Sequence, residues 1–149
     1  MKQVFFFLLV MMQLVIFSQE TIFFDKNWDE TSKEAASYYR KIEKKGGLYL
    51  IKDFYITGEL QFEGYAFNDR DPLDLDGVVT WYHQNGKISE KRGFSKHIPV
   101  GEVTAYYSNG VLKLKGNYKY GQCDGLYTQY FPRGNIANQG TFINGVVEG

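Results

Sequence analysis

The sequence predicts an all-β fold, an elongated single-layer antiparallel β-meander built from hairpin repeats of 24 residues, with a small N-terminal cap. Aromatic residues make up 17% of the 149 residues, and such a composition is typical of β-strands. All 16 glycines lie at or after Gly46, so the N-terminal segment follows different rules from the rest of the chain. The glycines also recur at a fixed spacing, which is typical of a repeat architecture.

The glycine spacing divides most of the chain into four repeats. The members of one series are each 24 residues apart, namely Gly77, Gly101, Gly125 and Gly149, and Gly86, Gly110 and Gly134 follow the same step. Gly58 precedes Gly86 by 28 residues, so about four inserted residues fall in the loop-like stretch 68–76. We therefore predict repeats at about residues 48–76, 77–100, 101–124 and 125–149.

Each repeat is predicted to form two antiparallel strands. Frequent glycines would break a helix, whereas Asn109-Gly110 between alternating apolar residues is typical of a two-residue type I′ turn. An even loop predicts four pairs, namely Ala105 with Leu114, Tyr107 with Leu112, Tyr118 with Tyr127, and Gly116 with Gln129. The glycines expected in structural turns are Gly58, Gly86, Gly110, Gly121, Gly134 and Gly145.

This register separates two faces of the predicted sheet. One face is apolar, and its candidate binding surface consists of Trp81, Tyr107, Leu114, Tyr118, Tyr127, Phe131 and Phe142. The other face collects polar and tyrosine side chains, among them Thr104, Tyr106, Lys113, Lys115, Asn117, Thr128 and Tyr130. An odd loop would mix the two sets, so the separation itself favours the even register.

The N-terminus is predicted to be an export signal. Lys2 precedes an almost unbroken apolar run over residues 4–17, which is too short for a comfortable membrane span but suits a signal peptide. Cleavage after Ser18 would release the mature chain to the periplasm, the cell envelope or the extracellular space. The alternative is a retained N-terminal anchor.

Residues 19–47 are predicted to be a cap segment. We expect a short helical turn near residues 29–35 followed by a strand, and residues 36–42 also suit a hairpin with residues 48–55. The aromatic side chains of this segment are expected to cover the first repeats, and the segment is too short to reach the last ones. The C-terminal repeats are therefore predicted to be the end at which the chain engages a partner or a second copy of itself.

Residues that could carry catalysis or hold a metal or cofactor are few. His83 shares its repeat position with Tyr107, so it is interpreted as a packing residue, and His97 as a solvated turn residue. Cys123 has no second cysteine to pair with in the chain. The acidic residues Asp69, Asp71, Asp74 and Asp76 are interpreted as a solvated loop, with a weak calcium site as the alternative. We predict no enzymatic activity, metal or cofactor, and the zero net charge argues against nucleic-acid binding.

Three stretches resemble the MORN repeat in its variant form. They are WYHQNGKISEKRGF, YYSNGVLKLKGNYKYGQCDG and YFPRGNIANQGTFINGVVEG. The resemblance covers about residues 48–149 and implies hairpin repeats. It also implies kinship with proteins labelled YwqK-type antitoxin components and with exported bacterial envelope proteins. Two positions depart from the pattern, since Arg92 replaces a glycine and Arg133 replaces the turn asparagine, and both suggest an altered turn or a bulge.

These observations predict an exported, non-catalytic repeat protein that acts as a protein-binding or scaffold module at the cell envelope. One alternative is an antitoxin-like component that neutralises a partner toxin. A second alternative is a module that binds an anionic membrane surface. The second rests on the lysines of the second strands, namely Lys87, Lys91, Lys113, Lys115 and Lys119, near Tyr82, Tyr106 and Tyr130.

Overall fold

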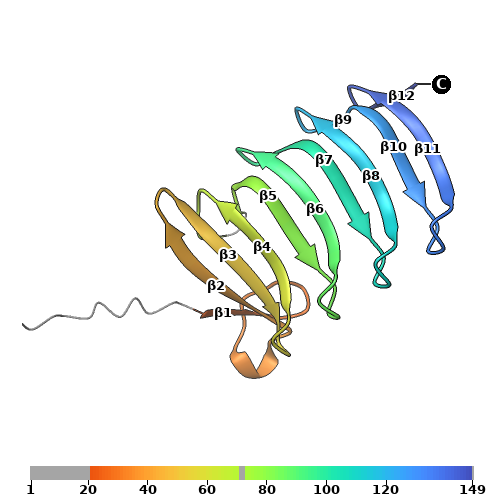
Figure 1. Ribbon diagram of the computed structural model, residues 1–149. Helices are drawn as coiled ribbons and strands as arrows, with labels where there is room; N and C mark the ends of the chain where they lie inside the picture. Colours follow the sequence, from red (N-terminus) through yellow and green to blue (C-terminus); the bar gives the residue numbers. More distant parts are fainter. Residues whose placement is uncertain (1–20, 71–72, 149) are drawn as a thin grey trace, which may run out of the picture.

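The computed structural model describes residues 21–70 and 73–148, which form one open antiparallel sheet in a single layer (Figure 1). Consecutive strands are neighbours throughout, in the order β1-β2-β3-β4-β5-β6-β7-β8-β10-β11-β12, and β9 pairs with β8. The predicted all-β meander is therefore confirmed. The predicted signal peptide, residues 1–18, lies outside the described residues.

The strands alternate between two edges of the sheet, where the turns lie. Their bounds are β1 Thr21–Phe24, β2 Tyr38–Lys45, β3 Leu48–Tyr55, β4 Leu60–Ala66, β5 Leu75–Tyr82, β6 Ile88–Ser95, β7 Ile98–Tyr106, β8 Leu112–Lys119, β9 Gln122–Cys123, β10 Gly125–Tyr130, β11 Ile136–Ile143 and β12 Val146–Glu148. We call the edge with the turns after β5, β7 and β10 the lower edge, as drawn in Figure 1, and the opposite one the upper edge.

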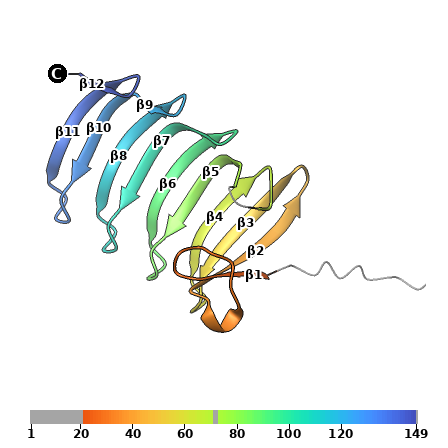
Figure 2. The same ribbon diagram turned by 180° about the vertical axis from the view of Figure 1, so that it is seen from behind.

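The N-terminal segment covers one face of the first repeats. It contains β1 and a single 3₁₀ turn, η1 (Lys33–Ala35), which confirms the expected helical turn. β2 and β3 also form the expected hairpin, with Lys45 opposite Leu48. Figure 2 shows the segment between β1 and β2 in front of the ends of β3 and β4. Trp28 in this segment stacks on Tyr38 with 4.5 Å between ring centroids, so aromatic contacts hold the cap to the sheet.

The turns at the lower edge differ from the predicted type I′ turns. In the turn after β7, only Gly110 has a positive φ, of 92°. The amide of Gly110 donates to the carbonyl oxygen of Tyr107 at 2.8 Å, and the amide of Tyr107 donates to that of Val111 at 2.9 Å. This is a three-residue loop in which the glycine takes the left-handed conformation.

A β-bulge compensates for the extra loop residue. The register shifts between Ala105 and Tyr106, so Tyr106 lies opposite Leu112, and the predicted pairing of Tyr107 with Leu112 is wrong. Ala105 lies opposite Leu114, as predicted. The loop has one residue more than the predicted two, and the bulge adds one residue to β8. These two single-residue offsets cancel, so the rest of the hairpin keeps an even register.

The type I′ geometry occurs at the upper edge instead. Each of three two-residue turns has positive φ at both positions, namely Lys96-His97 (48° and 67°), Tyr120-Gly121 (51° and 82°) and Asn144-Gly145 (50° and 82°). His97 is thus an exposed turn residue, as predicted. These tight turns fold the chain back so closely that Tyr118 pairs with Cys123 and not with Tyr127.

The register after these turns also corrects the last predicted pair, that of Gly116 with Gln129. Gln129 lies opposite Leu114 rather than opposite Gly116. This change in the pairing with β8 arises between β9 and β10. Gly125 has a φ of 92° there, and the chain bends from one strand into the next. Gly77 and Gly101 have φ values of 77° and 74° at the equivalent positions, so this series of the glycine period marks a bend in each repeat.

The four lower-edge hairpins have one geometry. The turn after β3 repeats the pattern, since the amide of Gly58 donates to the carbonyl oxygen of Tyr55 at 2.8 Å. The turn that contains Arg133 also repeats it, with a 2.8 Å bond from Gly134 to Phe131, so the expectation of an altered turn there is wrong. The other departure does not alter the register of the repeat either, because the register shift between Arg92 and Gly93 recurs between Glu63 and Tyr65, where the repeat has its glycine.

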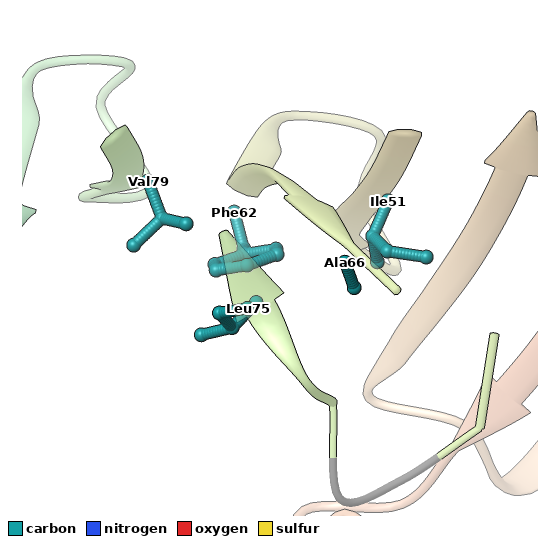
Figure 3. Close-up of a cluster of buried hydrophobic side chains, with 5 residues drawn as sticks. All are labelled: Ile51, Phe62, Ala66, Leu75 and Val79. Atoms are coloured by element: carbon teal, nitrogen blue, oxygen red, sulfur yellow. The ribbon is translucent and has the colours of Figure 1, made fainter. Parts of the chain in front are cut away.

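The hydrophobic core lies in the N-terminal half of the sheet. Its buried members are Ile51, Phe62, Ala66, Leu75 and Val79, from β3, β4 and β5 (Figure 3). Trp81 of β5 and Phe94 of β6 pack against them. Further along the described chain, Val103 is the only hydrophobic residue that is buried. The first repeats thus form a rigid base for the more exposed second half.

Candidate protein-binding groove

One face of the sheet carries most of the predicted binding surface. Cross-strand pairs join Trp81 to Glu90, Glu90 to Ala105 and Ala105 to Leu114, so these residues share a face. We call it the aromatic face, because Phe94, Tyr118, Tyr127 and Phe142 also lie on it. Five of the seven predicted residues are therefore brought together here, and each of the five is half-buried.

The other two predicted residues, Tyr107 and Phe131, lie in the lower-edge turns. The hydroxyl of Tyr107 donates to the carbonyl oxygen of Tyr130 in the next repeat at 2.7 Å. The equivalent hydroxyl of Tyr55 donates to the carbonyl oxygen of Tyr82 at 2.9 Å. This position therefore links neighbouring repeats, and Phe131, which has no polar tip, is 55% exposed there.

His83 fits the same linking role. Its Nε2 lies 2.8 Å from the carbonyl oxygen of Tyr106, so Nε2 carries the proton that this acceptor requires. The sequence predicted that His83 is a packing residue. Its ring occupies the position that Tyr107 has in the next repeat, and it also makes this hydrogen bond to Tyr106. The residue thus joins one repeat to the next.

A hollow of about 510 Å³ crosses the sheet from the end of β3 to β8, and we call it the groove. Aromatic side chains supply much of its wall, and polar side chains lie among them. The lining residues are Tyr55, Gln61, Trp81, Tyr82, His83, Ser89, Glu90, Arg92, Phe94, Ala105, Tyr106 and Lys113. A second hollow of about 340 Å³ beneath Trp28 shares Gln61 and Trp81 with it, so the depression continues under the cap.

An ion pair lies in the floor of the groove. Nη2 of Arg92 is 2.7 Å from Oε1 of Glu90, and both side chains are 30% exposed. The Arg92 guanidinium also lies 5.4 Å from the ring centroid of Tyr118, within the range of a cation–π contact. Its Nε is buried and makes no hydrogen bond to any described residue. Arg92 therefore combines a charge, an aromatic partner and one unsatisfied donor.

The departure at Arg92 changes the local packing of the repeat. At the equivalent position in the next repeat, an added Cβ on Gly116 would lie 2.5 Å from Cδ2 of Tyr127, so only glycine leaves room for that ring. Gly64 has the same relation to Val79, at 2.5 Å from Cγ1. In the second repeat the arginine side chain occupies this space, which places a charge where the other repeats have an apolar contact.

The β-bulges of the first three repeats each add one side chain to the lining of the groove. Gln61, Ser89 and Lys113 are the extra residues at the register shifts of β4, β6 and β8, and all three line the groove. Lys113 was predicted on the polar face, and that placement is wrong because the bulge redirects its side chain. Ser89 and Lys113 are 24 residues apart, a repeat signal that could have identified this position.

Burial affects the ionisation of the aromatic face. It raises the pKa of the Tyr118 hydroxyl, and it also raises the pKa of Tyr127. Both phenols are neutral near pH 7, so their rings present uncharged surface on the aromatic face. The charged residues that line the groove are Arg92, Glu90 and Lys113.

The opposite face is a regular polar ladder. Successive cross-strand pairs place Thr80, Lys91, Thr104, Lys115 and Thr128 side by side across the sheet. Two of the lysines on this face are paired with acids, since Lys115 lies 2.9 Å from Glu102 and Lys52 lies 2.7 Å from Glu63. The bond to Glu63 raises the pKa of Lys52 and keeps it charged.

Cys123, the one cysteine of the chain, is half-buried and free. Within residues 21–70 and 73–148, no group of three or more His, Cys, Asp or Glu side chains could hold a metal ion. No helix in the same part of the chain has the length and apolar character needed to cross a membrane.

The fold is that of an open-sheet repeat protein with a groove on one face. The family model described as the MORN repeat variant matches residues 75–96, 99–120 and 124–144. The chain therefore contains three consecutive MORN repeat variants, as the sequence resemblance predicted. MORN repeats are commonly protein- or membrane-binding modules and are typically non-catalytic. Neither the comparison with curated proteins nor that with solved structures gives a match.

Proposed function

We propose that this protein is a non-catalytic binding module that holds a segment of a partner protein in the groove. The groove itself carries this proposal, because it joins aromatic and charged side chains from five strands, β3, β5, β6, β7 and β8. Tryptophan, tyrosine and arginine are the residues that contribute most to protein–protein binding energy. Trp81, Tyr106 and Arg92 all line this one hollow.

The rigid base of the groove supports the same function. Trp81 packs against Phe62 with 5.3 Å between ring centroids, and Phe62 belongs to the buried core. A binding surface fixed to a packed core loses little conformational entropy when a partner binds. The exposed second half of the sheet extends this surface through Leu114 and Tyr118.

We place the function at the cell envelope, in the periplasm or outside the cell. The support for this location is the apolar run of residues 4–17 after Lys2, followed by Ser18. Mass spectrometry of the exported fraction is expected to find a mature chain that starts near Gln19. A full-length N-terminus in the membrane fraction would indicate an anchor instead.

Affinity capture from the cell envelope tests the proposed function. Ser89→Trp would fill the groove without removing any core side chain, and Ser108→Trp places the same ring in an exposed turn outside the groove. The mature wild-type protein and Ser108→Trp are expected to retain the same partner, and Ser89→Trp is expected to lose it. Equal capture by both variants would contradict the proposal.

The membrane-surface alternative has a weaker basis in the structure. Lysines do project from the polar face, but the pairs of Lys52 with Glu63 and of Lys115 with Glu102 offset part of their charge. Binding to anionic lipid depends on such unpaired charge. The antitoxin-like alternative depends on the sequence resemblance alone, and a small toxic protein encoded beside this one would support it.

A further inference from the structure

We infer that the groove binds an extended acidic peptide segment, with a peptide carboxylate at Lys113 and a peptide apolar side chain at Trp81. This inference rests on the proposed function and specifies the chemistry of the partner. It follows from the charges that line the groove and from the spacing of the bulged residues.

The charges of the groove leave an excess of positive charge at its β8 end. Arg92 and Glu90 pair with each other at 2.7 Å, so they largely neutralise one another. Lys113 is exposed and makes no ion pair with any described residue, and its Nζ lies 5.8 Å from the ring centroid of Tyr107. A carboxylate is the protein group that complements an ammonium beside an aromatic ring.

Apolar surface in the groove is supplied instead by β5 and β6. Trp81 of β5 and Phe94 of β6 are half-buried and pack against the core cluster. An aliphatic or aromatic side chain placed against them would remove apolar surface from water, which is favourable. The two parts of the groove therefore select two different side chains of one ligand.

The spacing of the strands determines how far apart those two side chains lie. β5 and β8 are separated by three strand-to-strand steps, or roughly 14 Å, and an extended peptide advances about 3.3 Å per residue. A peptide that crosses the strands would thus place its apolar and acidic side chains about four residues apart. Ser89 of β6 lies between β5 and β8, where it can hydrogen-bond the peptide backbone.

The shape of the site favours a peptide over a lipid surface. The groove is a hollow that crosses the strands on one face, and its one lysine lies beside the ring of Tyr107. A flat anionic membrane would instead meet a face on which several lysines project together. An extended chain can enter the recess and present its carboxylate along it.

Fluorescence anisotropy with two labelled peptides tests this inference on the mature protein. Each peptide has about twelve residues, mostly Thr and Gln, with Leu four positions before either Glu or Gln. The Glu peptide is expected to bind about tenfold more tightly than the Gln peptide, and added salt should reduce the difference. Lys113→Glu is expected to abolish it.

Lys119→Glu is the matched control. Lys119 is an exposed lysine of the same strand, and its Nζ lies 5.9 Å from the ring centroid of Tyr120, but it is outside the groove. This variant is expected to keep the preference for the Glu peptide. Equal affinity for the two peptides, no binding of either, or an equal loss in both lysine variants would overturn the inference.

This outcome is separable from failure of the proposed function. If Ser89→Trp blocks partner capture while Lys113→Glu changes no peptide affinity, the groove binds a protein of other chemistry and the inference is wrong. If Lys113→Glu abolishes the preference for the Glu peptide while Ser89→Trp retains the envelope partner, the peptide specificity holds and that partner binds elsewhere.

Discussion

Gly110 and Gly116 belong to the same glycine period but meet different physical demands. Gly110 has a φ of 92°, a conformation that side chains rarely adopt. Gly116 has no such φ, and it is required because the ring of Tyr127 lies against it. The period alone identified both positions. It could not show the second reason, because that depends on which residue of the next repeat lies opposite.

Substitution of Gly116 tests this close approach. Gly116→Ala would bring a Cβ to 2.5 Å from Cδ2 of Tyr127, and the ring must shift. We expect a loss of about 1–3 kcal/mol in the free energy of unfolding, which is typical of overpacking. Gly47→Ala is the control, since its Cβ would meet nothing within 4 Å. Urea denaturation that gives the same loss for both variants would contradict this packing.

The buried tyrosines predict a loss of stability in alkali. Burial raises the pKa of Tyr118 and of Tyr127 above the ordinary value near 10. As the pH rises past that value, the unfolded chain releases these protons first, so the folded state loses stability until its own raised pKa is passed. Below pH 10 the contribution is fully present.

Chemical denaturation at several pH values measures this effect. The free energy of unfolding is expected to be level from about pH 7 to 9 and to fall above about pH 10. The double variant Tyr118→Phe with Tyr127→Phe is expected to reduce the fall, and Tyr120→Phe, at a residue 83% exposed, is the control. A profile that is level to pH 11 in the wild type would show that these phenols are not buried.

The hairpin is the element that the sequence described best, although its turn was assigned wrongly. Asn109-Gly110 suits both a two-residue type I′ turn and a three-residue loop that ends in a left-handed glycine. The alternation of apolar residues required an even register, and the bulge at Lys113 supplies it. The strand body was therefore predictable, whereas the choice between two turns of similar composition was not.

Gly110→Val tests the conformation of the lower-edge turn. A β-branched residue at a φ of 92° is strained, so we expect a cost of about 1–3 kcal/mol in the free energy of unfolding. Ser108→Val, in the same loop but without a positive φ, is expected to cost less. Thermal unfolding that ranks the two variants equally would argue against a left-handed glycine in this turn.

At the scale of the whole molecule, the repeats differ in how well they are covered. The cap shields the first repeats, as the aromatic N-terminal segment predicted, and the core lies beneath it. In the last repeat, Leu126, Phe131, Ile136, Val146 and Val147 are all exposed. The described C-terminal repeat is therefore the least stable part of the sheet on packing grounds.

This exposure supports the prediction of self-association at the C-terminal repeat. Light scattering on the mature protein is expected to show a mass that rises with concentration. Phe131→Asp should weaken the association without loss of stability, since its side chain is more than half exposed. Phe142→Asp is less suitable, because Phe142 packs on Tyr127 at 5.6 Å. A strict monomer at every concentration would exclude this association.

The binding groove was only partly predictable from the sequence. Of the seven predicted surface residues, Trp81 lines the groove, whereas Leu114 lies on the same face outside it and Tyr107 proved to link two repeats. Lys113 could not be assigned to the groove, because strict alternation places it on the opposite face and only the bulge brings it across. Residues at bulges thus escape period-two reasoning, although their 24-residue recurrence is visible once the turn geometry is known.

Site-specific photo-crosslinking in the native envelope tests the central claim most directly. The photoreactive residue p-benzoylphenylalanine would replace Trp81 in the groove or, as a control, Tyr120 in an exposed upper-edge turn. The proposed function predicts a discrete protein adduct from position 81 and none from position 120. The same adduct from both positions, or from position 120 alone, would contradict partner binding in the groove.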